Sequence, residues 1–116
     1  MSKNIVQDKS FEFSLSIINL YKKMIEQNEY VLSKQLLRSG TSIGANIEEA
    51  TAGISRKDFI AKMSISSKEA RETRYWLKLI DKSNIVEVDI KEELNQVEDL
   101  INILTSIVKT SQQKLS

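Results

Sequence analysis

The chain has 116 residues, of which 41% are hydrophobic and 28% are charged, and its 17 Lys and Arg residues nearly balance its 16 Asp and Glu residues. This length predicts a single domain over residues 1–116, and the net charge of +1 gives no general reason to expect an acidic partner. The absence of Cys and His excludes disulfides, thiol nucleophiles, imidazole bases and zinc sites made of those side chains. The chain also has no proline to interrupt a helix.

Polar residues with capping chemistry predict two helices in the first half of the chain. We expect a first helix over about residues 8–28, because Asp8 or Ser10 can accept hydrogen bonds from the free N–H groups of a first helical turn. A second helix is expected over about 29–52, since it is followed by Gly53, a typical helix terminator.

Two more helices are predicted in the second half. Ser55 stands three residues before Asp58, a spacing that resembles a capping box and predicts a third helix over about 56–82. Asp89 is a candidate cap for a fourth helix over about 90–112.

Apolar residues repeat in alternating steps of three and four positions, which is the period of a helix rather than of a strand. The fourth predicted helix shows the pattern in Ile90, Leu94, Val97, Ile101, Leu104 and Val108. Four long helices with short links predict an all-α fold, an antiparallel up-down-up-down four-helix bundle. The heptad steps predict left-handed packing with shallow crossings.

The first predicted helix carries two apolar stripes when its residues are placed at about 100° per position. One stripe contains Phe11, Leu15, Ile18 and Ile25. The other, which we expect to face outward, supplies most of the candidate oligomer-interface residues: Phe13, Ile17, Leu20, Met24, Leu100, Ile103, Ile107 and Trp76. A second apolar face left in water would require a partner, although one wide stripe can also reach two neighbours within a bundle.

Gly40 and Gly44 lie in a run of small residues inside the second predicted helix. Each glycine costs a helix about 1 kcal/mol relative to Ala, so we expect both to permit close helix–helix packing. A phosphate-binding loop is the alternative, but the glycine spacing is one residue short and Ala45 stands where that motif requires Lys.

Charge is segregated along the chain and around the third helix. Residues 54–82 hold eight bases and four acids, whereas residues 83–116 hold three bases and six acids. The candidate nucleic-acid-binding residues share one flank of the third helix: Lys57, Lys68, Arg71, Arg74, Lys78 and Lys82. This flank is either a footprint for phosphates or a solvated face with neighbouring ion pairs such as Asp58–Lys62. Trp76 is expected to pack on the bundle rather than to stack on a base.

Catalytic and membrane signals are weak. Adjacent carboxylates diverge by about 100° on a helix, so we expect no enzyme activity, no cofactor and no metal site. The longest uncharged runs have nine residues, whereas a membrane span needs about 20. The N-terminal residues lack the apolar core of a signal peptide, so a cytoplasmic location is expected.

Three segments resemble a known family more specifically than these patterns do. They are Leu37–Ala50, Lys57–Ser64 and Lys68–Lys78, and they are similar to the bacterial four-helix-bundle family named for 23S ribosomal RNA intervening sequences. The resemblance implies a non-enzymatic cytoplasmic bundle that forms ring-like pentamers. The accessory protein of diversity-generating retroelements looks like a relative, and it binds nucleic acid and a reverse transcriptase. The chain departs from the family at Ser66-Ser67, where Ala-Leu is expected.

These observations predict a homo-oligomeric module, expected to be a pentameric ring, that binds RNA or DNA through a basic helix flank repeated by symmetry. The alternative is a scaffold for protein partners whose basic flank serves contacts between subunits.

Overall fold

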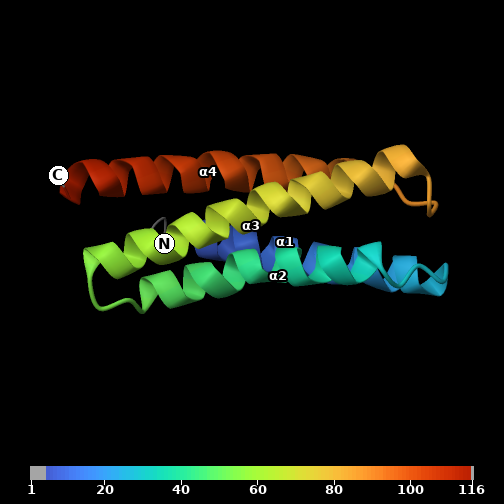
Figure 1. Cartoon of the computed structure of the whole chain (residues 1–116), viewed down its shortest axis with the longest axis horizontal. Helices are drawn as coiled ribbons and strands as arrows, with labels where there is room; N and C mark the ends of the chain where they lie inside the picture. Colours follow the sequence, from blue (N-terminus) through green and yellow to red (C-terminus); the bar gives the residue numbers. More distant parts are fainter. Residues whose placement is uncertain (1–4, 116) are drawn as a thin grey trace.

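The computed structural model describes residues 5–115, which form four long α-helices, each antiparallel to the next (Figure 1). The helices are α1 (Ile5–Glu26), α2 (Leu32–Thr51), α3 (Arg56–Ser83) and α4 (Lys91–Leu115). Each packs on the next, and α4 packs back on α1, in a molecule of 48 × 25 × 21 Å. The predicted all-α up-down bundle is therefore confirmed, and left-handed packing stays a prediction. Within residues 5–115, no helix is long and apolar enough to cross a membrane.

The ends of α1 differ from the expected ones. Within the described residues α1 already includes Ile5, so Asp8 and Ser10 both lie inside the helix and neither caps its start. It ends in a Schellman turn, in which Asn28 has a φ of 65°, its N–H donates to the carbonyl of Ile25, and the next N–H donates to the carbonyl of Met24. Asn tolerates this left-handed conformation because its short polar side chain can form local hydrogen bonds, and here Oδ1 of Asn28 accepts one of 2.9 Å from the hydroxyl of Tyr30.

The ends of α3 and the start of α4 follow the capping signals in the sequence. Ser55 Oγ accepts a hydrogen bond of 3.1 Å from the N–H of Asp58. Asn84, with a φ of 54°, is the C-cap of α3. Asp89 Oδ1 accepts a hydrogen bond of 3.1 Å from the N–H of Lys91 at the start of α4. Local side-chain chemistry thus sets these boundaries.

The two stripes of α1 are exchanged relative to the prediction. Four residues expected to face outward, Phe13, Ile17, Leu20 and Met24, are buried in the core of the chain itself. Leu100 is buried with them, while Ile103, Ile107 and Trp76 are partly buried against the core. The outward stripe is the other one, with Phe11 66% and Leu15 49% exposed. Both stripes have helical spacing, so the period alone does not decide which of them α2 and α4 cover.

Gly40 lies at a close contact between α1 and α2. A Cβ atom at this position would stand 2.8 Å from Cγ2 of Ile17, inside van der Waals contact. At Gly44 the nearest atom outside α2, Oγ of Ser10, would stand 3.4 Å away, which is an ordinary contact. Both glycines lie inside α2 rather than in a loop, so the structure supports the packing interpretation, and more strongly for Gly40.

Candidate nucleic-acid interface

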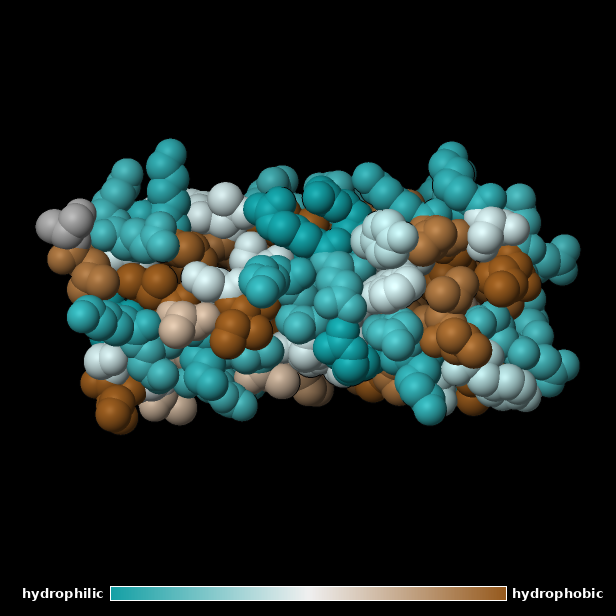
Figure 2. All heavy atoms as spheres, viewed as in Figure 1, coloured by the Kyte–Doolittle hydropathy of each residue, from teal (hydrophilic) through white to brown (hydrophobic). Residues whose placement is uncertain are grey.

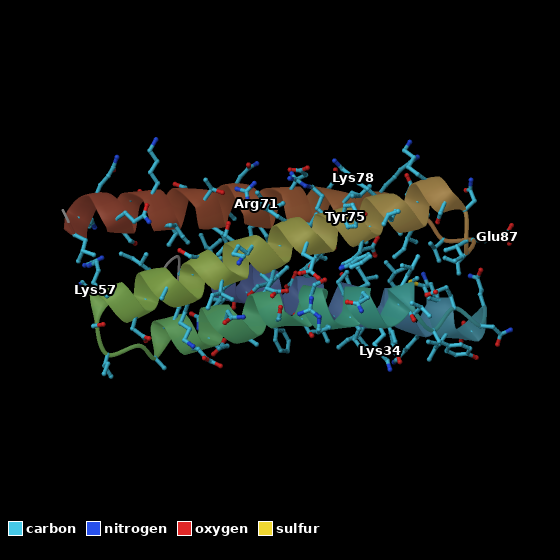
Figure 3. The ribbon with its side chains drawn as sticks, in the orientation of Figure 1. Lys34, Lys57, Arg71, Tyr75, Lys78 and Glu87 are labelled. Atoms are coloured by element: carbon cyan, nitrogen blue, oxygen red, sulfur yellow. The ribbon has the colours of Figure 1, made fainter. Side chains whose placement is uncertain are left out.

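The basic residues of α3 follow its outward side and the edge that faces α4. Lys57, Lys68, Lys78 and Lys82 are exposed, and none of them forms an ion pair with another residue of the described range 5–115. Figure 3 shows Lys57 and Lys78 at separate points along α3. At 1.5 Å per residue, this row of four lysines spans about 37 Å. On the face seen in Figure 2, hydrophilic side chains cover the middle of the bundle.

The two arginines predicted to face phosphates make contacts within the chain. Nη1 of Arg74 lies 3.1 and 3.0 Å from the two carboxylate oxygens of Glu98 on α4. Nη2 of Arg71 donates a hydrogen bond of 2.9 Å to Oγ1 of Thr105, also on α4. Arg74 therefore joins α3 to α4, whereas Arg71 keeps most of its N–H donors unused. The sequence could not show this, because the side chains that α4 presents depend on how the helices pack.

A groove follows the seam between α3 and α4 on the N-terminal side of Arg71. Its volume is about 250 Å³, and it is lined by Ser64, Ser67, Arg71, Thr105, Val108, Lys109 and Gln112. A second hollow of about 440 Å³ adjoins it, because Gln112 also lines that one with Lys57, Ile60 and Leu115. Lys109 was missed by the sequence prediction, since it is an isolated base in an acidic segment and only the packing brings it beside Arg71.

The opposite edge of α3 carries acids and binds α2. Arg38 of α2 makes ion pairs with Glu69 at 3.4 Å and with Glu72 at 2.5 Å. The indole N–H of Trp76 donates to Glu72 at 3.1 Å and is the main cause that lowers the pKa of Glu72, against a smaller opposing effect of burial. Trp76 thus has a structural partner, while Tyr75 is 58% exposed beside it, with ring centroids 5.3 Å apart.

Ion pairs of α3 join neighbouring helices rather than successive turns. Lys62 pairs with Glu49 of α2 at 3.0 Å instead of forming the expected ion pair with Asp58. Glu49 is also the main cause that raises the pKa of Lys62. Across residues 5–115, no three Asp or Glu side chains gather closely enough to hold a metal ion.

Comparisons with known proteins agree with the fold. A family model described as the 23S rRNA-intervening sequence protein matches residues 2–108. A solved structure of a protein with unknown function from the S23 ribosomal protein family of Bacteroides thetaiotaomicron VPI-5482 is 49% identical in sequence. That match covers 94% of this chain and 99% of the other, with a TM-score of 0.88. No curated protein matches this chain.

Proposed function

This chain belongs to the 23S rRNA-intervening sequence protein family, and from that premise we propose that it is a non-enzymatic, cytoplasmic, homo-oligomeric module that binds RNA or DNA phosphates. The observation that carries the proposal is the row of four lysines on α3, Lys57, Lys68, Lys78 and Lys82. They are exposed and form no ion pair within residues 5–115. Unpaired cations spaced along one helix attract a polyanion without requiring a pocket.

Binding by one copy would be weak, because one helix offers only about four to six phosphate contacts and each is sensitive to salt. A symmetric assembly repeats the row of lysines, and linked sites gain avidity. We propose a ring for this assembly, with the pentameric order that the family resemblance implies. Its supporting surface is the outward stripe of α1, where Phe11 and Leu15 expose apolar area.

Neutralising part of the row tests the phosphate contacts. The Lys68→Gln/Lys78→Gln protein should bind single-stranded RNA about tenfold more weakly, and its salt slope should fall by about 1.4, which is 0.7 for each lost contact. The matched control is Lys22→Gln/Lys34→Gln, which removes two exposed lysines from α1 and α2 and should bind like the parent. Affinity and slope are measured by fluorescence anisotropy at several salt concentrations, with the assembly mass checked for each protein.

Equal losses in both double variants would show that only net charge matters, and no loss in either would refute the proposal. A scaffold for protein partners is the second candidate, and one observation favours it: Arg74 of the basic flank already serves a contact between helices through Glu98. If Lys68→Gln/Lys78→Gln keeps its RNA affinity but separates into monomers, the basic flank serves subunit contacts and the scaffold function is supported.

A further inference from the structure

We propose that the groove between α3 and α4 is a binding site for a phosphate group, centred on Arg71 and Lys109. The inference deepens the proposed function, because it names a discrete phosphate subsite beside the row of lysines. The inference rests on the proposed function only in taking the phosphate to belong to a nucleic acid.

The chemistry of the groove lining favours an anion. Arg71 and Lys109 are its two charged residues, and no Asp or Glu lines it. Ser64, Ser67 and Thr105 add hydroxyl groups that can donate hydrogen bonds. The nearby acid Glu98, two helical turns before Thr105 on α4, is already paired with Arg74. A cation would find few ligands here, whereas an anion would find many donors.

These donors are largely unused within the described residues 5–115. The hydroxyls of Ser64 and Ser67 have no hydrogen-bond partner there, and Lys109 forms no ion pair. Arg71 uses one of its N–H groups on Thr105. That single hydrogen bond holds the guanidinium at the groove and leaves the rest of its donor fork available.

The size of the site leaves room for a phosphate group. A hollow of about 250 Å³ is smaller than the range of about 300–1,000 Å³ usual for whole organic ligands, so it suits a small group. Phosphate presents several acceptor oxygens at once. An arginine fork can bind two of them while a lysine and serine hydroxyls reach the others.

Ser67 contributes one of the hydroxyl groups of the groove, and its substitution can test the site. It occupies the second position of the Ser66-Ser67 pair, one helical turn before Arg71 on α3. Ser66 is buried and donates to the carbonyl of Ile43 on α2, so of these two serines Ser67 is the one that lines the groove. A leucine at position 67 would replace a donor by an apolar side chain and fill part of the hollow.

The first experiment titrates the isotopically labelled protein with inorganic phosphate at constant ionic strength and follows its NMR spectrum. We expect saturable shifts confined to residues 64–71 and 105–112. Arg71→Gln should abolish saturable phosphate binding. Arg71→Lys should keep part of the phosphate affinity, because lysine retains the charge but lacks the guanidinium fork. Lys109→Gln should weaken phosphate binding several-fold. Ser67→Leu should also remove it, while the control Lys34→Gln leaves it unchanged. Shifts that are absent, unsaturable or unaffected by Arg71→Gln would overturn the proposal.

The second experiment separates the two sources of phosphate and the two proposals. Two RNA oligonucleotides of one sequence are compared, with a 5′-phosphate or a 5′-hydroxyl. If the phosphorylated one binds more tightly and Arg71→Gln removes the difference, the site takes a terminal phosphate. If Arg71→Gln weakens the binding of both oligonucleotides equally, the site takes a backbone phosphate.

The same measurements separate the site from the proposed function. If neither RNA binds but inorganic phosphate saturates the groove, the proposed function fails and the site stands. If Lys68→Gln/Lys78→Gln weakens RNA binding, Arg71→Gln does not, and inorganic phosphate gives no saturable shifts, the site fails and the proposed function stands.

Discussion

Glu29 fixes the start of α2 with one carboxylate. Its oxygens accept hydrogen bonds from the backbone N–H groups of Val31, Leu32 and Ser33, the shortest being 2.7 Å to Ser33. The hydroxyl of Ser33 donates back to the carbonyl of Glu29 at 2.7 Å. Burial raises the pKa of Glu29, but the backbone hydrogen bonds from Leu32, Ser33 and Val31 together outweigh it, so the pKa lies below its ordinary value of 4.5.

Replacing Glu29 should therefore destabilise the bundle near neutral pH. A depressed pKa means that the stabilisation is fully present above the unfolded-state value and is lost as the pH falls through the folded-state value. We expect Glu29→Gln to lower the free energy of unfolding by about 1 kcal/mol at pH 7, as other lost helix caps do. Urea denaturation at pH 7 and pH 3 should show the difference shrinking in acid. The control Glu26→Gln, exposed in the last turn of α1, should change little.

Glu93 on α4 behaves in the opposite way. Its Oε1 atom is buried and, among residues 5–115, has no hydrogen-bond partner, and the same holds for Oε1 of Gln96. Burial is the main cause that raises the pKa of Glu93, and Glu92 and Asp89 act in the same direction. A hydrogen bond from its own backbone N–H opposes them, as does Lys23 of α1. The carboxylate at this position is thus a cost to the fold.

Removing that charge should stabilise the protein. With a raised pKa, the contribution of Glu93 is fully present below the unfolded-state value and is lost as the pH rises through the folded-state value. Glu93→Gln resembles the protonated form, so we expect it to raise the free energy of unfolding at pH 7 by about 0.5 kcal/mol after solvent screening. Thermal unfolding should show no such gain at pH 3. A destabilised variant at pH 7 would contradict this account.

The two glycines of α2 make a matched pair. Gly40→Ala places Cβ against the β-branched, fully buried Ile17, which has little room to move, so we expect a loss of about 1–3 kcal/mol. Gly44→Ala meets only ordinary contacts and should stabilise the helix by up to about 1 kcal/mol. Denaturation midpoints of the two variants measure the contrast. Equal effects would show that α1 and α2 can separate freely at both positions.

At the scale of the elements, α3 binds its two neighbours with opposite charges. Its acidic edge, Glu69 and Glu72, pairs with Arg38 of α2, and its basic edge pairs through Arg74 with Glu98 of α4. Segregation of charge around α3 therefore serves packing as well as any ligand. The lysines of the outward row take no part in these ion pairs, so they remain able to contact a ligand, whereas Arg74 serves the packing of the helices.

The Arg74–Glu98 pair gives the test at this scale. Arg74→Gln should lower the free energy of unfolding by about 0.5–1 kcal/mol, because the pair is partly exposed and one guanidinium nitrogen, Nη1, contacts both carboxylate oxygens of Glu98. It should weaken RNA binding less than Lys78→Gln, which in turn should leave stability unchanged. A double-mutant cycle with Glu98→Gln measures the coupling. A variant that loses RNA affinity but no stability would place Arg74 in the binding surface instead.

At the scale of the whole molecule, the outward stripe of α1 is the surface that the bundle itself does not cover. Phe11→Ser/Leu15→Ser should convert the assembly to monomers while leaving the helical content unchanged, because both side chains are about half exposed or more. Light scattering measures the mass and circular dichroism the fold. The control is Ile54→Ser, which removes a 98% exposed apolar side chain from the link between α2 and α3. A monomeric parent protein would refute the assembly.

The sequence by itself determined the number of helices, their approximate ends and the class of the fold. Apolar spacing and caps such as Ser55 are local properties, and local hydrogen bonding and helical geometry suffice to read them. The α1 end was predicted only to within a few residues, because the Schellman turn at Asn28 leaves several residues outside both helices.

Only the tertiary structure decided which faces meet. Helical spacing treats the two stripes of α1 as equivalent, and it is the packing that buries Phe13 and exposes Phe11. The packing of α3 on α4 likewise pairs Arg74 with Glu98 and places Lys109 in the same groove as Arg71. The two residues of each pair are more than 20 positions apart in the sequence. The physical reason is that a helix fixes the angles among its own side chains, whereas the surface opposite each of them belongs to a neighbour that the helix does not encode.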